Sequence, residues 1–209
     1  MPRSIKVLSP PEGFQYRGEF IVPAEEAELE REIADLPFKE FEFHGYLGKR
    51  RVVSFGWRYD FGEQELARAD DIPYFLLPIR ERAAEFASLE PEHFAHILVT
   101  EYTPGTTIGW HRDRGVFGDI VGVSLHSACI FRFRRALTKG TWERHSLTLA
   151  PRSAYLLHGP SRSEWEHSVA PVAELRYSIT FRSLRSEGEL KQAEANTHKS
   201  NDPQMSFVF

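Results

Sequence analysis

The chain has little of what would mark an extracellular or membrane protein. Its 209 residues include one cysteine and two methionines. A single cysteine cannot form an internal disulfide, and Cys129 lies in an apolar run, so we expect a buried thiol without a chemical role. No segment approaches the roughly 20 apolar residues that span a bilayer, and residues 1–13 lack the apolar stretch of a secretory signal. We therefore expect a soluble, cytoplasmic protein with no membrane association.

The composition favours one globular domain, because 41% of the residues are hydrophobic and the length suits a single core. The net charge is −4, but it is unevenly distributed. Residues 101–185 carry an excess of Lys and Arg, whereas the remainder is acidic. This asymmetry permits a polyanionic ligand such as nucleic acid, and an ordinary solvated surface is an equally good interpretation.

Three segments near the N-terminus have clear local patterns. Residues 23–36 combine strong helix formers with spaced apolar positions, which predicts an amphipathic helix. Residues 49–61 are β-branched and aromatic around Gly56, which predicts paired strands with a turn at that glycine, in a ribbon or hairpin. Residues 74–86 predict a second helix, with Pro78 at its start or at a kink.

From residue 96 onward, short β-type runs alternate with turn residues at about ten-residue spacing. Eight runs have this character: HILVTEY, TIGWHRD, DIVGVSL, ACIFRFR, HSLTLA, SAYLLH, WEHSVA and RYSITFRSL. The pattern predicts a mainly β protein with N-terminal helices (α+β) and a jelly-roll, or double-stranded β-helix, core. We expect one domain over 1–185, with helices and a hairpin at about 20–90 and the core at about 95–185, followed by a loosely ordered polar tail over 186–209.

The sequence Trp110-His-Arg-Asp-Arg contains a His-x-Asp pair, His111 and Asp113. Such pairs arise often by chance, so their context must supply the meaning. In an extended strand, residues two apart point to one face, and both side chains could then reach one metal. Imidazole and carboxylate suit Fe(II) when a distant histidine completes the set. Spacing alone leaves His158 and His167 as alternatives for that third ligand.

A second element is the run from Arg176 to Arg182. Alternation along a strand places its polar residues on one face and its apolar residues on the other. The polar face consists of Arg176, Ser178, Thr180 and Arg182. Inside a barrel this stripe would be costly unless it bound an anion, and arginine pairs well with carboxylates. The alternative is a strand whose polar side faces water.

Taken in order, these motifs resemble the AlkB-like family of Fe(II)- and 2-oxoglutarate-dependent dioxygenases over roughly residues 45–185. The matching elements are Tyr102-x-x-Gly105, Ile108 to Asp113, Val123-Ser124-Leu125, Ser161-Arg162 through His167, and Arg176 through Arg182. The resemblance selects His167 over His158. It thus implies an iron centre formed by His111, Asp113 and His167.

The resemblance also implies sites for the co-substrate. Arg176 would bind the distal carboxylate of 2-oxoglutarate with help from Tyr102, and Arg182 would lie near the proximal carboxylate and the metal. Thr100 and Ser178 stand where the family often has asparagine, and their shorter side chains reach less far. His126 replaces a common glycine, and we interpret it as a residue that caps a strand.

The implied reaction uses Fe(II), 2-oxoglutarate and O₂ to hydroxylate a C–H bond, yielding succinate and CO₂. An N-methyl group hydroxylated in this way leaves as formaldehyde. Residues 55–61 resemble the family's nucleotide-recognition lid, in which Trp57 and Tyr59 would stack on a base; they equally suit a plain hairpin surface. Candidate phosphate contacts are Arg112, Arg114 and Arg162.

The predicted function is oxidative demethylation of N-alkylated bases in single-stranded DNA or RNA, without an obligate protein partner. Gly115 stands where some members have an acidic residue that contacts the base. This departure keeps two alternatives open, namely the same chemistry on a protein or small molecule, and a non-catalytic nucleic-acid-binding module.

Overall fold

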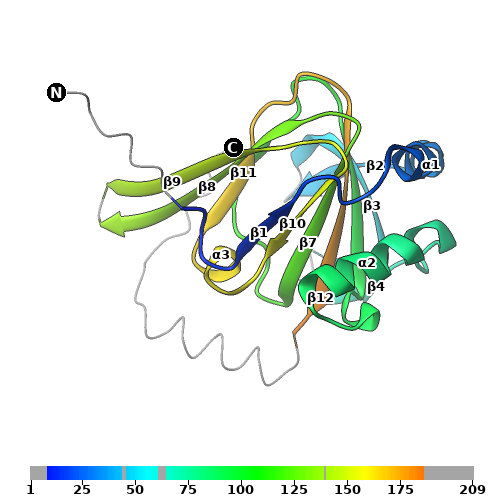
Figure 1. The fold of residues 1–209 in the computed structure, drawn as a ribbon, viewed down its shortest axis with the longest axis horizontal. Coiled ribbons are helices and arrows are strands. Elements are labelled where there is room, and N and C mark those ends of the chain that lie inside the picture. The colour runs from blue at the N-terminus through cyan, green and yellow to red at the C-terminus, as the bar shows by residue number, and fades with distance from the viewer. Residues whose placement is uncertain (1–8, 44–45, 61–64, 139, 186–209) are drawn as a thin grey trace.

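The computed structural model describes residues 9–43, 46–60, 65–138 and 140–185. Its strands form two facing antiparallel sheets (Figure 1). The larger sheet has the order β1-β10-β7-β12-β5-β3-β2, and β4 pairs with β3; the smaller sheet has the order β6-β11-β8-β9. Facing sheets of this kind confirm the predicted jelly-roll core.

All eight predicted strand runs form strands. The larger sheet contains β1 (Phe14–Arg17), β2 (Lys39–Phe43), β3 (Tyr46–Asp60), β4 (Glu65–Arg68), β5 (His96–Tyr102), β7 (Phe117–Leu125), β10 (Ser153–Leu157) and β12 (Arg176–Leu184). The smaller sheet contains β6 (Ile108–His111), β8 (Cys129–Thr138), β9 (Thr141–Leu149) and β11 (Glu166–Val169).

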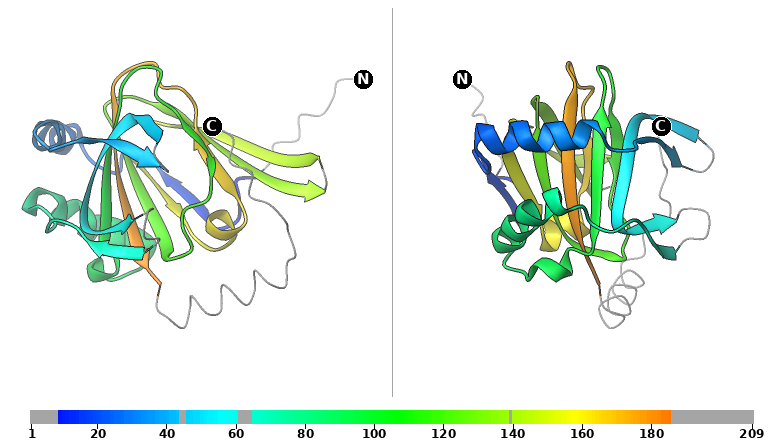
Figure 2. Two further views of the ribbon diagram at one scale, coloured as in Figure 1. Left: turned by 180° about the vertical axis from the view of Figure 1, so that it is seen from behind. Right: turned by 90° about the vertical axis from the view of Figure 1, so that its right-hand side faces the viewer.

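Both predicted helices are present on the outer side of the larger sheet (Figure 2). They are α1 (Pro23–Ala34), and α2 (Leu77–Ala87) preceded by the 3₁₀ turn η1 (Tyr74–Leu76); the shorter elements are η2 (Pro91–His93) and α3 (Gly159–Ser163). Pro78 lies in the first turn of α2, where a missing N–H costs nothing, so it starts the helix without a kink. In the part of the chain that the structure describes, no helix is long and apolar enough to cross a membrane.

Two apolar clusters flank the larger sheet. One joins its outer face to the helices and includes Leu29, Ile33, Ile79, Ala83, Val99, Ile179 and Phe181. The other fills the space between the sheets and includes Tyr102, Ile120, Phe131, Phe133, Leu149 and Tyr155. Strand β12 therefore contacts apolar residues on one face and sends its polar stripe between the sheets. This arrangement confirms the predicted alternation and excludes a stripe that faces water.

The predicted turn at Gly56 is wrong. Strand β3 continues through this residue, which has a φ of +74°. Before Gly56 the strand pairs with β5, and after it with β4, where Trp57 lies opposite Arg68. A Cβ at Gly56 would lie 2.2 Å from the carbonyl oxygen of Ala95, so glycine permits both the backbone angle and the close approach. The residue redirects a long strand, and the hairpin is formed by β3 and β4.

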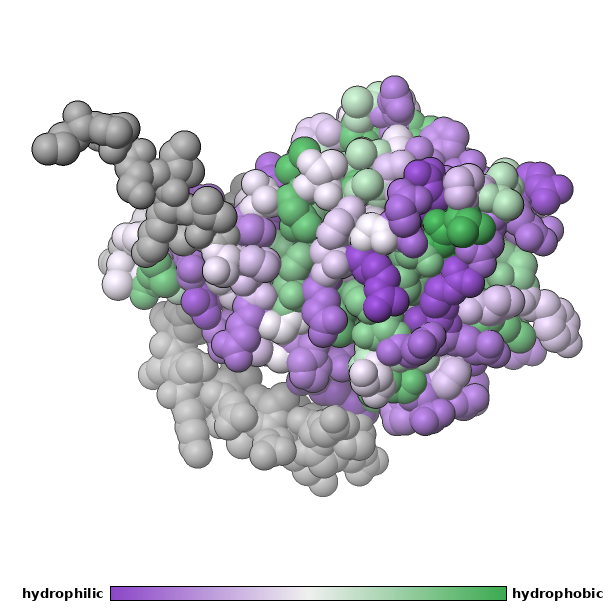
Figure 3. Space-filling view, viewed as in Figure 1, coloured by the Kyte–Doolittle hydropathy of each residue, from purple (hydrophilic) through white to green (hydrophobic). Residues whose placement is uncertain are grey.

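The surface and the remaining predicted segments add little to the site. On the face seen in Figure 3, hydrophobic residues are interspersed among hydrophilic ones. Cys129 is buried as expected, and burial raises the pKa of its thiol. Phe61 and the predicted tail over 186–209 lie outside the described residues, so the domain boundary at 185 stays a prediction.

Candidate metal and co-substrate site

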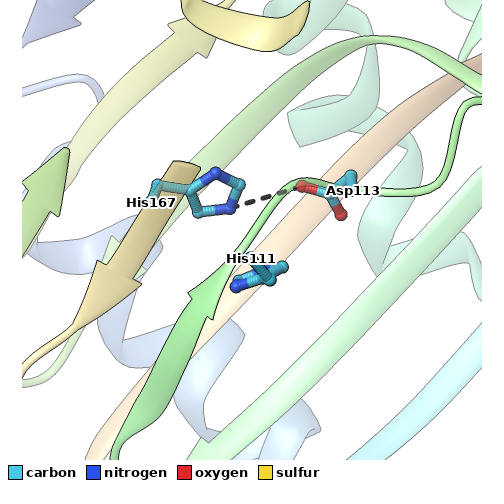
Figure 4. A group of neighbouring side chains, drawn as sticks. All are labelled: His111, Asp113 and His167. Atoms are coloured by element: carbon cyan, nitrogen blue, oxygen red, sulfur yellow. Dashed lines mark ion pairs between the residues drawn. The ribbon is translucent and has the colours of Figure 1, made fainter. Parts of the chain in front are cut away.

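The side chains of His111, Asp113 and His167 point toward one another between the two sheets (Figure 4). One ligand atom from each lies within 4.8 Å of the others. His111 and His167 are directly paired across β6 and β11, and their ring centroids are 4.3 Å apart. The Nε2 atom of His167 lies 3.3 Å from Oδ2 of Asp113. These three side chains have the donor set and proximity that a 2-His-1-carboxylate iron site requires.

The expectation that His111 and Asp113 lie on one strand and point to the same face is met only in part. Strand β6 ends at His111, and Asp113 lies two residues beyond it, outside regular structure. Arg182 holds the carboxylate of Asp113 in this position, because its Nε and Nη2 atoms lie 3.0 Å and 2.9 Å from Oδ1 of Asp113. Nδ1 of His111 donates to the carbonyl oxygen of Gly109 at 3.0 Å, which leaves Nε2 of that ring free for a metal.

Burial and charge hold the three groups in the protonation states that metal binding needs. Burial lowers the pKa of His111, and burial followed by the charge of His111 lowers the pKa of His167 to about 3. Burial alone would raise the pKa of Asp113, but the positive charge of Arg182 and the nearby imidazoles lower it below its usual range. At neutral pH the site therefore presents two neutral imidazoles and one carboxylate.

A cavity of about 60 Å³ adjoins these residues. All five residues that the sequence assigns to co-substrate binding line it, as do the three candidate ligands: Thr100, Tyr102, Arg176, Ser178 and Arg182, with His111, Asp113 and His167. The pairing of β12 with β5 brings Arg176 opposite Tyr102 and Ser178 opposite Thr100. The residues expected at the co-substrate site therefore share one polar wall of the cavity, and their role in binding stays a prediction.

Arg176 has the environment of an anion-binding residue. Its side chain is 2% exposed, its Nε donates to Ser124 Oγ at 3.2 Å, and its guanidinium lies over the ring of Tyr102. Its Nη1 atom is buried without a hydrogen-bond partner among the described residues. Leaving such a donor unsatisfied is costly, and a carboxylate bound in the cavity would satisfy it. The residues present therefore fit a dicarboxylate.

Arg50 on β3 also lines the cavity, and sequence reasoning missed it. Its guanidinium lies 3.8 Å from the ring centroid of Phe41. Burial is the main factor that lowers its pKa, and the charge of Asp113 opposes this. Nothing in the run Lys49-Arg50-Arg51 distinguishes this inward arginine from Arg51, which pairs with Glu101. Only the strand register shows which of the two reaches the site.

The predicted phosphate contact of Arg162 is contradicted by its burial. The side chain is 5% exposed. Its Nε donates to the carbonyl of Gly118 at 3.0 Å, and its Nη2 donates to those of Arg114 and Phe117 at 2.7 Å and 2.8 Å. Arg162 thus ties α3 to the segment that follows Asp113. This position suits a residue that holds the backbone beside Asp113 in place.

The other predicted substrate residues lie away from the cavity wall. The guanidinium of Arg68 lies 4.4 Å from the ring centroid of Trp57, and that of Arg114 lies 5.2 Å from the ring centroid of Tyr59. Arg112 is exposed, and its Nη1 donates to the carbonyl of Ser163 at 3.2 Å. The β3–β4 hairpin therefore contacts the segment just after Asp113, although none of these residues lines the cavity.

The two remaining histidines of interest bind elsewhere. His158 is exposed, and its Nδ1 lies 2.8 Å from Oδ1 of Asp119. His126 follows β7 with a φ of +71°, and its Nδ1 lies 3.2 Å from Oε1 of Glu30 on α1. Neither belongs to the candidate metal group.

Comparisons with known proteins agree with this geometry. The family model described as the 2OG-Fe(II) oxygenase superfamily matches residues 35–182. An Arabidopsis thaliana relative, "Alkylated DNA repair protein ALKBH8 homolog", is 30% identical over 165 residues, which are 66% of this chain and 47% of the relative. "Uncharacterized protein L905" of Acanthamoeba polyphaga mimivirus is 25% identical over 196 residues, which are 82% of this chain and 85% of that protein. This chain thus spans about half the length of the Arabidopsis relative.

The solved structure of OsALKBH1 has the same fold, with a TM-score of 0.65 and 16% identity over 84% of this chain and 98% of that one. The chain belongs to the 2OG-Fe(II) oxygenase superfamily, and its relatives confirm the AlkB-like resemblance. That superfamily uses Fe(II) and 2-oxoglutarate, and the donor set of His111, Asp113 and His167 fits the metal.

Proposed function

We propose that this enzyme oxidatively demethylates N-alkylated bases in single-stranded DNA or RNA. The observation that carries the proposal is the position of the β3–β4 hairpin beside the candidate metal site. The contact between Tyr59 and Arg114 joins the hairpin to the segment after Asp113. Aromatic and basic side chains at this position suit a base taken out of its stack. The printed name of the Arabidopsis relative refers to alkylated DNA repair, which supports the same substrate class.

In this proposal His111, Asp113 and His167 hold Fe(II), and Arg176 and Tyr102 hold the distal carboxylate of 2-oxoglutarate. When bound, these groups and O₂ supply the oxidation that hydroxylates the methyl group, which then leaves as formaldehyde alongside succinate and CO₂. The chain's own part is to orient the substrate and exclude water from the cavity.

The residues have distinct tasks. Arg182 fixes the Asp113 carboxylate, and Arg162 holds the segment beyond it. Trp57 and Tyr59 stack on the target base or its neighbour, and Arg112 and Arg114 lie on the surface where phosphates would pass. Each stacking contact contributes on the order of 1–3 kcal/mol.

The test is a turnover screen with Fe(II), 2-oxoglutarate and air. Substrates are single-stranded DNA and RNA oligonucleotides that carry individual N-methylated bases, with methylated peptides as the competing class. We expect loss of methyl mass from at least one oligonucleotide, with one succinate per methyl group removed. His111→Ala and Asp113→Ala serve as controls that lack a metal ligand. Demethylation of peptides but not of any oligonucleotide would refute the substrate class and leave the dioxygenase chemistry intact.

A further inference from the structure

Tyr155 faces the same cavity as Arg176, and no motif singles it out. It lies on β10, is 9% exposed, and lines the cavity together with Tyr102 and Arg176. Its neighbour across the sheet is Gly122 on β7. A tyrosine at this position adds a polar atom to a cavity that apolar side chains such as Ile120, Phe131 and Leu149 also line.

Gly122 makes room for the phenol. A Cβ on this glycine would lie 2.3 Å from Cζ and 2.5 Å from the hydroxyl oxygen of Tyr155. The φ of Gly122 lies outside the positive range, so the position requires glycine for space and not for conformation. The ring cannot simply move aside, because Phe131 packs on it with a centroid distance of 4.9 Å and Phe14 with 6.4 Å. The phenol is therefore fixed in place.

No side-chain hydrogen bond found among the described residues involves the hydroxyl of Tyr155, whose side chain lines the cavity. Buried tyrosine hydroxyls usually find one, because an unsatisfied donor costs about 1–3 kcal/mol. Burial, followed by the charge of Tyr102, raises the pKa of Tyr155, so the phenol keeps its proton and stays a donor. Arg176 Nη1 is a buried donor without a partner and lines the same cavity. A bound carboxylate would accept hydrogen bonds from both the guanidinium and the phenol.

We propose that the Tyr155 hydroxyl donates a hydrogen bond to the distal carboxylate of 2-oxoglutarate, beside Arg176, and that Gly122 makes this contact possible. The two residues thereby enforce the choice of a dicarboxylate. The inference rests on the co-substrate of the superfamily and on the position of Arg176, and it is independent of which substrate is demethylated.

The test measures binding and not turnover. Protein loaded with Mn(II) is titrated by calorimetry with 2-oxoglutarate and with 2-oxopentanoate, which has a methyl group in place of the distal carboxylate. Because a hydrogen bond to a charged group contributes about 1.5–3 kcal/mol, Tyr155→Phe should raise the Kd for 2-oxoglutarate by about tenfold or more. The Kd for 2-oxopentanoate should change by less than about twofold. Equal changes for both ligands, or no change for either, would overturn the proposal.

Two further variants separate the contact from packing. Gly122→Ala forces the ring of Tyr155 out of its place and should reduce the selectivity for 2-oxoglutarate over 2-oxopentanoate as Tyr155→Phe does. In the Tyr155→Phe background, Gly122→Ala should have no further effect on this selectivity. Tyr177→Phe is the matched control, since Tyr177 lies on the helix-facing side of β12 and should leave both affinities unchanged. Additive effects of Gly122→Ala and Tyr155→Phe on selectivity would show that the two residues do not act through one contact, and would contradict the account.

Discussion

The two sides of the site differ in how they are built. The proposed co-substrate wall is formed by β5, β7, β10 and β12, which pair in register within the larger sheet. The proposed substrate side consists of the β3–β4 hairpin and the segment after Asp113, where Arg112 is exposed and Trp57 and Tyr59 are partly so. A binding site on paired strands is rigid, which suits a co-substrate that is the same in every turnover. A binding site on surface segments can differ in sequence and shape according to the substrate. In the proposed function, the paired strands set the chemistry and the surface segments set the target.

The largest effect is expected from removal of a metal ligand. His111→Ala or Asp113→Ala should reduce Fe(II)-dependent succinate formation to background, because two ligands do not hold the metal in the open geometry that the reaction needs. Succinate measured by mass spectrometry, with metal content determined in parallel, checks this. Full turnover by either variant would contradict the assignment of both sides, since each is defined relative to this centre.

Arg176→Ala should weaken 2-oxoglutarate binding by about 10- to 100-fold, the effect of losing a charge-assisted contact of about 1.5–3 kcal/mol. Fe(II) affinity should stay nearly constant, because Arg176 does not contact the three ligands. Titrations of each component in the presence of the other measure the two constants. Equal losses of affinity for 2-oxoglutarate and for Fe(II) would mean that the co-substrate wall and the metal centre do not act as separate units.

Arg162→Ala should weaken metal binding by about 10- to 100-fold, as is typical when the groups that orient ligands are lost. Its three bonds to backbone carbonyls hold the segment that follows Asp113. The matched control is Arg112→Ala, an exposed arginine one residue before Asp113. Similar metal affinities in the two variants would argue against a positioning role for Arg162.

The wall should also become less stable in acid. Burial, followed by the charge of Arg182, lowers the pKa of His96 well below 6.5, whereas the unfolded chain titrates near that value. Below about pH 6.5, only the unfolded state takes up this proton. The contribution of His96 to the free energy of unfolding is therefore fully present above about pH 6.5 and is lost as the pH falls. From about pH 7.5 to pH 5, this residue should lower the free energy of unfolding by at most about 2 kcal/mol, the limit set by the titration of the unfolded chain.

Denaturant unfolding of the metal-free protein measures the slope, and His96→Asn is the comparison. Asparagine keeps an acceptor for Nη1 of Arg182, which lies 3.4 Å from Nδ1 of His96, but does not titrate. The variant should show a shallower loss of stability over the same pH range. Identical slopes would show that His96 takes up its proton in the folded state.

The smallest effect is expected on the substrate side. Arg112→Ala should weaken oligonucleotide binding by about two- to threefold and reduce the salt dependence by about one counterion. Affinity for 2-oxoglutarate should be unchanged. Binding measured by fluorescence anisotropy over a range of salt concentrations tests this. An unchanged salt slope would remove Arg112 from the proposed path of the phosphates.

Sequence patterns predicted the buried co-substrate wall better than the exposed substrate side. The alternation of Arg176, Ser178 and Thr180 identifies a cavity wall because a strand of period two leaves no other face for these residues. The jelly-roll strands follow from the same regularity. Arg50 and Tyr155 were missed because their roles depend on register between strands far apart in the chain, which a local pattern does not contain.

The errors have equally local causes. Gly56 resembled a turn because glycine tolerates positive φ, but here that conformation redirects one continuous strand. Arg162 resembled a phosphate contact because arginine is usually exposed, yet its guanidinium satisfies three backbone carbonyls. In both cases the residue type was correctly noted, and the tertiary contact decided its role.

The central claim is that one cavity holds the metal at the His111, Asp113 and His167 end and a dicarboxylate at the Arg176 end. A crystal structure of the protein with Mn(II) and 2-oxoglutarate tests it most directly. We predict Mn(II) bound by those three side chains, with the 2-oxo acid end on the metal and the distal carboxylate against Arg176. Mn(II) bound by other residues, or a distal carboxylate that points away from Arg176, would contradict the account.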